Sequence, residues 1–464
     1  MTEKVVTTVY FVLLNITSVF VLYYAFLGVV GLFVRKQRYA MREDELKFCI
    51  FVPCHNEETV IGATVENLAK IRYFQRLFDI YFIADNCSDR TAEAIRRAIK
   101  NCKVSNFYVL ERNVNDPAKK GKPHAMNWGI ELLEAENKFY NKYDMFMIFD
   151  ADNFVDADIL KHVNSQYLSF KENKRPVMIQ TYLDSKNKNS LIARGYYASY
   201  RITNGFFQLP KYALGLVPAI GGTGFAMATD FLKEIGGYHC TSLVEDLEIQ
   251  TIATLKGKKI AYNHNARIYD EKPTKLKQSA VQKTRWAQGH WFVFFKYGWR
   301  MFLHMLNPKE IKLFFKRLDN LLYLSSTLFL LISMFTVVFS IVGMSIGVLP
   351  HTPVLFTFSV SLFLTLLFPI SSLLDGRKKE KKRALLAFLP NLLASFIGGL
   401  IFCYADIVGL LHCGNQKVWK KTAHKVTTME AEKEKIDIVP SKAIEIMTEI
   451  ATTEENKEED GRVG

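Results

Sequence analysis

The sequence lacks the cysteine pattern of a zinc site or of a disulfide framework. Its 464 residues include seven cysteines, an odd number, and none of them forms a CxxC pair or a His–Cys spacing that suits zinc. Scattered cysteines of this kind are typical of reduced thiols packed in a core, as in proteins of the cytosol.

Charged side chains are absent from residues 9–34. As a helix this run would measure about 39 Å, which is enough to cross a bilayer with some tilt. A cleaved signal peptide is shorter and is followed by a small-residue cleavage site, whereas Arg35, Lys36 and Arg38 follow here. The sequence therefore predicts a retained membrane anchor within residues 1–40.

The charge pattern argues against nucleic acid as a partner, although the net charge is +14. Residues 429–464 are acidic and lack aromatic side chains, which predicts a disordered tail. Basic residues elsewhere gather beside apolar segments, as in residues 377–383. Such clusters are typical of cytoplasmic loops that face anionic lipid headgroups. We therefore expect membrane lipid, and no nucleic acid, as a partner.

Between the apolar parts, residues 41–284 have the texture of a soluble domain on the cytoplasmic side. Short apolar runs that suit buried strands alternate with segments of helical spacing, which predicts an α/β domain with a mainly parallel sheet. The expected strands are 47–54, 77–84, 107–110 and 144–149, and the expected helices are 58–72, 88–100 and 122–136. In open sheets of this kind, ligands bind at the carboxyl ends of strands.

Three aspartates follow such strands. Asp85 follows the second expected strand, and Asp150 and Asp152 follow the fourth. Paired carboxylates at a strand end suit Mg²⁺ or Mn²⁺ bridging the phosphates of a nucleotide, and Asp85 suits hydrogen bonds to a nucleoside. The alternatives are a solvated turn for the pair and a helix cap for Asp85. The same DxD pattern recurs at residues 156–158, where it fits the first turn of a helix instead.

Two predicted helix starts add further polar groups. Lys122 opens a helix, where an ammonium suits a phosphate or a uracil carbonyl, and a solvent-facing lysine is an equal alternative. Asp246 lies in the first turn of another helix and is the candidate general base. Glu245 either orients that base or simply interacts favourably with the helix dipole. One base without a partner nucleophile predicts single displacement, and hence inversion at the reacting carbon.

The strongest single signal is the sequence QKTRW at residues 282–286. Gln282, Arg285 and Trp286 fall within two helical turns. Arg285 can hold a pyrophosphate as charge develops on it, and Trp286 offers a flat apolar face on which a sugar ring can stack. A tryptophan that anchors the membrane interface is the alternative for Trp286.

The amino-acid composition changes beyond residue 284. Residues 285–317 mix aromatic and basic side chains and are interrupted at Pro308, which predicts amphipathic helices in the headgroup layer, with Trp291 and Trp299 in an aromatic belt. A soluble helix pair is the alternative. Residues 318–413 form the predicted C-terminal transmembrane region, which includes crossings at 321–348 and 353–374.

Residues 384–413 would measure about 45 Å as a helix, which is too long for one comfortable crossing. Pro390 and the glycine pair at 398–399 interrupt them, and the basic clusters on either side are expected to be cytoplasmic. We therefore expect this segment to re-enter the membrane or to lie partly along its interface.

These motifs, in this order, resemble the membrane-embedded family 2 glycosyltransferases, which include cellulose, poly-N-acetylglucosamine, chitin and hyaluronan synthases. The resemblance covers residues 48–300 well and extends loosely to Thr422. Residues 53–58 look like the family's opening strand-end motif. The residues that look like its "D, DxD, ED, QxxRW" signature are Asp85, Asp150, Asp152, Glu245, Asp246, Gln282, Arg285 and Trp286.

The resemblance implies a GT-A fold, a UDP-sugar donor, a divalent metal on Asp150 and Asp152, and an inverting transfer with Asp246 as base. Gly222 and Thr223 fall in the segment that contacts the acceptor in this family. Residues 414–428 resemble a cytoplasmic segment that can gate the site, although His424 stands where the cellulose synthases carry lysine. The single N-terminal membrane helix also departs from relatives that have two or more.

Three functions follow from these features. The favoured one is a processive inverting β-glycosyltransferase, an enzyme of the cell membrane with several membrane crossings and a cytoplasmic catalytic domain. It would polymerise a hexose from a UDP-sugar, with UDP-glucose preferred and UDP-N-acetylglucosamine next. The second is a non-processive transferase that adds one sugar to a lipid acceptor. The third is a nucleotide-sugar sensor without catalysis, for which the acidic tail is the support.

Overall fold

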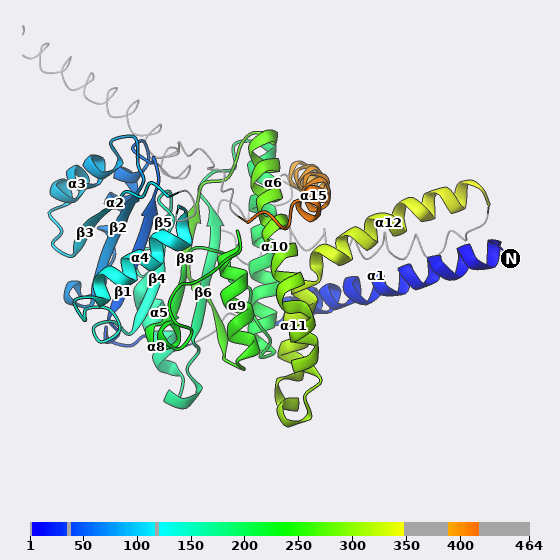
Figure 1. The fold of residues 1–464 in the computed structure, drawn as a ribbon, viewed down its shortest axis with the longest axis horizontal. Helices are drawn as coiled ribbons and strands as arrows, with labels where there is room; N and C mark the ends of the chain where they lie inside the picture. The colour runs from blue at the N-terminus through cyan, green and yellow to red at the C-terminus, as the bar shows by residue number, and fades with distance from the viewer. Residues whose placement is uncertain (1, 35–38, 117–119, 348–387, 417–464) are drawn as a thin grey trace, which may run out of the picture.

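The computed structural model describes residues 2–34, 39–116, 120–347 and 388–416 (Figure 1). An α/β body occupies one side of the molecule, and two long helices, α1 and α12, extend from it side by side. The expected crossing at 353–374 and the expected acidic tail at 429–464 lie outside the described residues.

The body is built on a single sheet of eight strands in the order β3-β2-β1-β4-β7-β6-β8-β5. The strands are β1 (Phe48–Cys54), β2 (Phe78–Asp85), β3 (Phe107–Arg112), β4 (Met145–Ile148), β5 (Phe154–Val155), β6 (Met178–Ser185), β7 (Phe225–Ala228) and β8 (Ile260–Asp270). Strands β3, β2, β1 and β4 are mutually parallel, as predicted, while β7 runs antiparallel to both β4 and β6.

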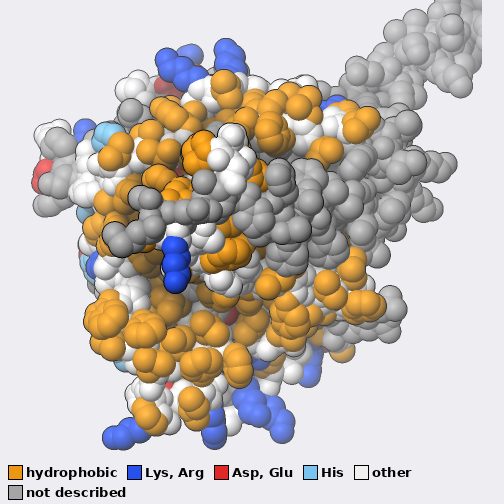
Figure 2. All heavy atoms as spheres, turned by 90° about the vertical axis from the view of Figure 1, so that its right-hand side faces the viewer, with side chains coloured by type: hydrophobic (Ala, Val, Ile, Leu, Met, Phe, Trp, Pro, Cys, Tyr) orange, Lys and Arg blue, Asp and Glu red, His pale blue; other side chains and the backbone are white. Residues whose placement is uncertain are grey.

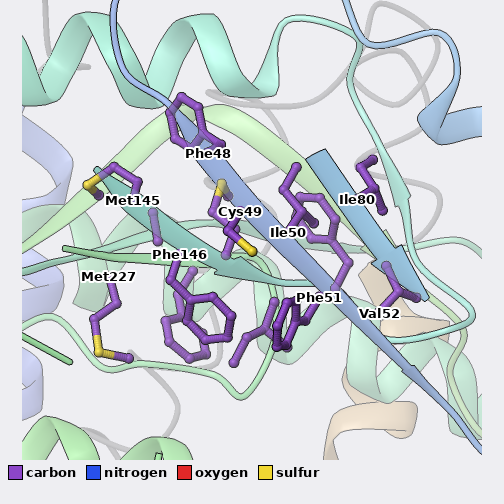
Figure 3. Packing of buried hydrophobic residues seen from close by; sticks show 14 of the residues in the cluster. Phe48, Cys49, Ile50, Phe51, Val52, Ile80, Met145, Phe146 and Met227 are labelled. Atoms are coloured by element: carbon purple, nitrogen blue, oxygen red, sulfur yellow. The ribbon is translucent and has the colours of Figure 1, made fainter. Parts of the chain in front are cut away.

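The core lies on both faces of these strands, because their apolar runs leave few polar side chains to face water. Phe51 of β1 is fully buried and meets Phe146 of β4 edge to face, with ring centroids 5.1 Å apart (Figure 3). Helices cover the sheet: α2 (Ile61–Leu68), α3 (Thr91–Cys102), α4 (Lys122–Glu134), α5 (Ile159–Ser169), α8 (Thr229–Glu234) and α9 (Glu245–Leu255). The α/β prediction is therefore confirmed.

A continuous helical stretch borders the second half of the sheet. It comprises α6 (Leu191–Ile202), the π-helical segment η4 (Thr203–Gln208) and α7 (Leu209–Ala213). Within it, the Asn204 side chain donates to the carbonyls of Tyr200 and Leu183 and accepts from the Tyr262 hydroxyl, so it joins this helical stretch to β6 and β8.

The two extending helices form an antiparallel pair. Helix α1 (Thr2–Phe33) has 32 residues and a length of about 48 Å, and α12 (Ser326–Ser345) measures about 30 Å. Phe20 stacks on Phe329 with ring centroids 4.6 Å apart, and the Thr17 and Thr336 hydroxyls lie 3.4 Å apart. By length and composition, α1, α12 and α15 (Phe388–Leu411) are long and apolar enough to cross a membrane.

Helix α15 corrects one expectation about residues 384–413. It runs unbroken from Phe388, where the described part begins, through Pro390 and the two glycines at 398–399. It is seen nearly end on in Figure 1, so its direction differs from that of α1 and α12. It packs on α6 and α10, and Lys283 donates to the Gly398 carbonyl at 2.7 Å. Its location along the membrane interface stays a prediction.

Helix α10 (Leu276–Met305) begins nine residues before the expected boundary at 285, and Pro308 opens the short segment η5 (Pro308–Leu313) before α11 (Phe314–Leu324). Trp299 is 70% exposed, as an aromatic belt requires, but Trp291 is only 2% exposed and donates its indole N–H to Asp406 of α15. Trp291 therefore joins two helices and does not face lipid. Figure 2 shows hydrophobic side chains gathered over the face from which α1 and α12 project.

Candidate active site

The first predicted site residue, Asp85, is the last residue of β2 and is buried. Parallel register places it beside Arg112 at the end of β3, and the Arg112 Nη1 lies 2.6 Å from the Asp85 Oδ1. Asn86 donates to the same oxygen at 2.6 Å, and the ring of His55 lies 2.7 Å from the Asp85 carbonyl oxygen. The sequence reasoning missed Arg112, which strand register would have revealed.

The DxD residues lie on a turn that follows β4. The Asp150 amide donates to the Asn153 Oδ1 at 2.8 Å and to the Thr223 Oγ1 at 3.1 Å. Asp152 is buried, and its Oδ2 accepts from the Glu271 amide at 2.7 Å. The Asp150 side chain, in contrast, is 39% exposed. The turn thus holds Asp152 firmly and leaves Asp150 facing the open side of the site.

Lys122, at the start of α4, joins three parts of the site. Its Nζ lies 2.8 Å from the Asp150 Oδ1, 2.8 Å from the Gly222 carbonyl oxygen and 3.5 Å from the Glu245 Oε1. Burial disfavours the ammonium, but the charges of Asp150 and Glu245 outweigh it and raise the pKa of Lys122. The lysine is therefore charged, and it does not face solvent as the alternative had it.

Asp246 lies in the first turn of α9, as predicted. The Leu247 amide donates to its Oδ1 at 2.8 Å. Burial and then the charge of Glu245 raise the pKa of Asp246 to about 7, while Lys122 and Arg285 oppose that rise. A carboxylate with a pKa near 7 can take up a proton during a reaction and release it again.

The loop at residues 217–224 passes directly beside that carboxylate. Gly222 has a φ of 73°, and a Cβ added to it would lie 3.1 Å from the Asp246 Oδ2, so only glycine fits both the backbone and the space. The Thr223 hydroxyl is buried and donates to Asn153. Thr223 therefore supports the DxD turn, and its predicted contact with an acceptor stays a prediction.

Three glutamines hold this loop by its backbone, and the sequence reasoning missed all of them. Their carbonyl oxygens accept from successive amides of the loop: Gln208 from Ala219 at 2.7 Å, Gln250 from Ile220 at 2.8 Å and Gln180 from Gly221 at 2.8 Å. They come from η4, α9 and β6, so no short-range pattern links them. The loop is consequently fixed from three sides.

The QKTRW residues lie on α10. The charge of Arg285 reaches Asp246 and lowers its pKa. The Trp286 ring meets the edge of Tyr196 on α6, with ring centroids 6.1 Å apart. The Gln282 Oε1 is buried and has no hydrogen-bond partner among the described residues. The motif therefore lies within electrostatic reach of Asp246 and packs against α6.

The end of α15 reaches the same site. The Leu243 amide, three residues before the base, donates to the Gln416 Oε1 at 2.8 Å. Gln288 of α10 donates to the carbonyls of His412 and Asn415 and holds the end of α15 in place. The predicted gating segment 414–428 thus starts beside the residues that precede α9, and its remainder, from residue 417, lies outside the described residues.

The second DxD match, at residues 156–158, is structural. Asp158 pairs with Arg72, and Asp156 accepts from the Tyr269 hydroxyl at 3.1 Å. Asp158 stands at the start of α5 without a capping hydrogen bond from its side chain. The second match thus stands at the start of a helix, as predicted, but Asp158 forms an ion pair and does not cap the helix.

Asp150 and Asp152 are suited to a divalent cation that arrives with a phosphate ligand. Within the described ranges, no group of three or more His, Cys, Asp or Glu side chains is arranged to hold a metal by itself. Mg²⁺ commonly takes one or two carboxylates and completes its shell with water and substrate phosphates. Asp270 adds negative charge nearby: burial raises its pKa to about 6, Lys272 opposes the rise and Asp152 adds to it. The donor set fits such an ion.

Known proteins share this architecture. A family model described as "Glycosyltransferase like family 2" matches residues 46–289. Poly-beta-1,6-N-acetyl-D-glucosamine synthase of Staphylococcus aureus is 26% identical over 264 residues, which are 55% of this chain and 59% of that protein. The probable glycosyltransferase YdaM of Bacillus subtilis is 25% identical over 300 residues, 62% of this chain and 68% of that one.

The chain thus matches about three fifths of the length of the staphylococcal synthases. Among solved structures, a mannosyltransferase from Pyrobaculum calidifontis in complex with GDP-Man and Mn²⁺ superposes with a TM-score of 0.53. It is 15% identical, and the match covers 86% of this chain and 97% of that one, which shows a shared GT-A fold.

Proposed function

This chain belongs to glycosyltransferase family 2, and on that premise we propose that its cleft transfers a hexose from a UDP-sugar to a growing glycan at the cell membrane, with inversion at the anomeric carbon. The supporting observation is the convergence on Lys122. That side chain contacts Asp150, Glu245 and the carbonyl of Gly222, so the phosphate, base and acceptor parts of the site face one another.

Asp246 is the proposed base. The acceptor hydroxyl attacks the anomeric carbon of the donor while its proton passes to the Asp246 carboxylate. The bond from that carbon to the phosphate oxygen breaks, and its electron pair leaves with UDP. A pKa of about 7 keeps a useful fraction of the carboxylate ionised at neutral pH.

The donor is proposed to lie between the strand ends and α10. Asp85, fixed by Arg112, binds the nucleoside, and Lys122 and Arg285 face the diphosphate. Gln282 offers a buried oxygen without a partner among the described residues, which a donor hydroxyl would satisfy. On the acceptor side, Trp286, Gly222 and Thr223 remain the proposed contacts.

Asp150 and Asp152 are proposed to hold Mg²⁺ or Mn²⁺. When bound there, such an ion neutralises the charge of the leaving diphosphate. The similar mannosyltransferase fold was solved with Mn²⁺ and a nucleotide sugar, which supports the choice of ions. Lys122 shares the Asp150 carboxylate and keeps the site from accumulating negative charge before the donor binds.

The donor sugar is proposed as N-acetylglucosamine first and glucose second. The sequence alone favoured glucose, but the staphylococcal relative carries poly-β-1,6-N-acetylglucosamine synthesis in its name, which reverses that order. The hydrophobic face in Figure 2 and the apolar pair of α1 and α12 support a site at the membrane. A cytoplasmic α/β body and several crossings are proposed from the basic clusters beside the apolar segments.

The test uses the purified full-length chain with radiolabelled UDP-N-acetylglucosamine or UDP-glucose and Mn²⁺ or Mg²⁺. Long water-soluble or insoluble chains are expected, whereas a labelled product that extracts into organic solvent would identify the non-processive lipid transferase instead. Asp246→Asn and Asp150→Asn should abolish incorporation, and Asp158→Asn, in the second DxD match, should retain it. Equal activity of all three variants would exclude the proposed site.

A further inference from the structure

The N-terminal helix enters the catalytic body and does not end at its surface. We propose that α1 is a working part of the acceptor side of the cleft: Tyr23 of α1, with Asp319 and Lys211, positions the loop at residues 217–224 against the base. This inference rests on the proposed function and adds positioning residues to it.

Helix α1 is longer than a membrane needs, and its two parts have different neighbours. Residues 4–22 would span about 29 Å, close to the thickness of a hydrocarbon core, and they pair with α12 through Phe20 and Thr17. From Tyr23 onward the helix contacts η4, α7 and α11 of the body. The second part therefore extends past the membrane-sized length and packs into the enzyme.

The second part of α1, from Tyr23 onward, contacts Asp319 of α11, which is 1% exposed. Its carboxylate accepts from the Tyr23 hydroxyl, from the Lys211 Nζ at 2.7 Å and from the Val217 amide at 2.7 Å. Buried charges persist only when they are paired and hydrogen-bonded, so these donors depend on one another. Helix α1, α7 and the first residue of the loop at residues 217–224 thus meet on one carboxylate.

The loop at residues 217–224 connects the contact with Asp319 to Asp246, the proposed base. Val217 stands five residues before Gly222, where an added Cβ would lie 3.1 Å from the Asp246 Oδ2. The amides between them are held by the glutamines already described, and Gln208, the first of these, sits on η4. Since η4 also packs against α1, the loop is tied to α1 at both Val217 and Ala219.

The packing of α1 on η4 is close. A Cβ on Gly31 would lie 2.7 Å from the Phe206 ring and 3.0 Å from the Gly205 carbonyl oxygen, so the two helices approach to a distance that only glycine permits. The ring of Tyr24 meets Phe207 edge on, with ring centroids 5.0 Å apart. The orientation of Tyr23 toward Asp319 is therefore fixed by its neighbours on the helix.

Greater mobility of the loop at residues 217–224 should slow transfer to a sugar hydroxyl more than it slows hydrolysis of the donor by water. Transfer to a sugar hydroxyl needs that hydroxyl aligned with Asp246, whereas hydrolysis of the donor to UDP and free sugar needs only a water molecule there. The proposed nucleoside contacts, Asp85 and Arg112, lie on β2 and β3. The bonds that join Gly222 and Thr223 to Lys122 and to the DxD turn are separate from the bond at Val217. Donor binding should consequently be preserved.

The experiment compares Tyr23→Phe with Tyr24→Phe in the purified full-length protein, with UDP-N-acetylglucosamine and UDP-glucose as probes. The two changes remove a hydroxyl from adjacent tyrosines, but the Tyr24 hydroxyl makes no hydrogen bond to any described residue, while the Tyr23 hydroxyl donates to Asp319. Total UDP release and sugar incorporated into glycan are measured separately, together with the KM for the donor.

Tyr23→Phe is expected to lower incorporation by about tenfold, with donor KM and hydrolysis unchanged, and Tyr24→Phe to behave as the parent chain. Hydrogen exchange at residues 217–221 should become faster in Tyr23→Phe and stay unchanged in β1. An equal fall in hydrolysis and transfer, or no change in either, would overturn the inference. A parent chain that neither hydrolyses nor transfers would instead overturn the proposed function, and the positioning role with it.

Asp319→Asn provides a second variant, since it keeps the shape of the side chain and removes the charge. It should give the same shift from transfer to hydrolysis, and the double variant Asp319→Asn with Lys211→Met, which removes both charges of the buried pair, should recover stability without recovering transfer. Recovery of transfer in the double variant would show that the pair serves stability alone.

Discussion

The Lys122 ammonium and the Asp150 carboxylate form an ion pair of 2.8 Å in the candidate site, where the start of α4 meets the turn after β4. The same ammonium reaches Glu245 beside the base. The Lys122 ammonium therefore neutralises charge on both the proposed phosphate-binding side and the proposed acid–base side of the site. Its substitution should change both donor binding and the pH profile.

Lys122→Met should raise the KM for the donor by at least about tenfold, because a charge-assisted contact to the diphosphate is lost. It should also move the acidic limb of the pH profile to higher pH, since the Lys122 charge holds the pKa of Asp246 down. Initial rates between pH 5 and 9 measure both effects. Lys120→Met, at an exposed position two residues earlier, serves as the control, and a shift of the limb to lower pH would contradict the proposed contact.

The parent enzyme should lose activity as the pH falls through about 7. Asp246 must be ionised to accept a proton, and burial raises its pKa to about 7, so half of the sites should be protonated and inactive near that pH. The measurement is kcat against pH at saturating donor. A profile that stays flat down to pH 5 would assign the base to another group.

Arg112→Met should destabilise the fold by about 3–5 kcal/mol, because it leaves Asp85 buried without its partner. Denaturant unfolding in detergent measures the change. The matched control is Arg96→Met, which breaks a nearby pair with Glu111 on the exposed side of β3, where solvent screens the charges and little change is expected. Similar unfolding of both variants would show that burial does not strengthen the Asp85 pair.

Gln416→Leu should lower kcat by about fivefold and leave the KM for the donor unchanged. The change removes one hydrogen bond to the Leu243 amide, in the loop that leads into the base, and a bond of this kind contributes about 1 kcal/mol. Steady-state kinetics with varied donor separates the two constants. A rise in donor KM alone would place Gln416 on the donor side and not behind the base.

The sequence predicted the parts of the site whose signal is local. Asp85 and Asp150 follow apolar runs that end at the same edge of a parallel sheet, and Asp246 opens a helix that its spacing reveals. The α/β fold followed from the same alternation of strands and helices. These features depend on neighbours in the chain, so a single sequence contains them.

Other features depend on contacts between distant segments, and the sequence did not reveal them. The glutamines that hold the loop at 217–224 lie on a strand and two helical segments, and their spacing carries no period. Trp291 is of a residue type that is common at membrane interfaces, yet α15 covers it. The glycines at 398–399 suggested a break, but tertiary packing outweighs their low helix propensity in α15.

The bond between Leu243 and Gln416 joins positions separated by most of the second half of the chain. During synthesis the α/β body is therefore complete in sequence long before the last contact behind its base can form. The ribosome must synthesise residue 416 before the Leu243–Gln416 bond can form, so an emerging polypeptide completes this part of the site late.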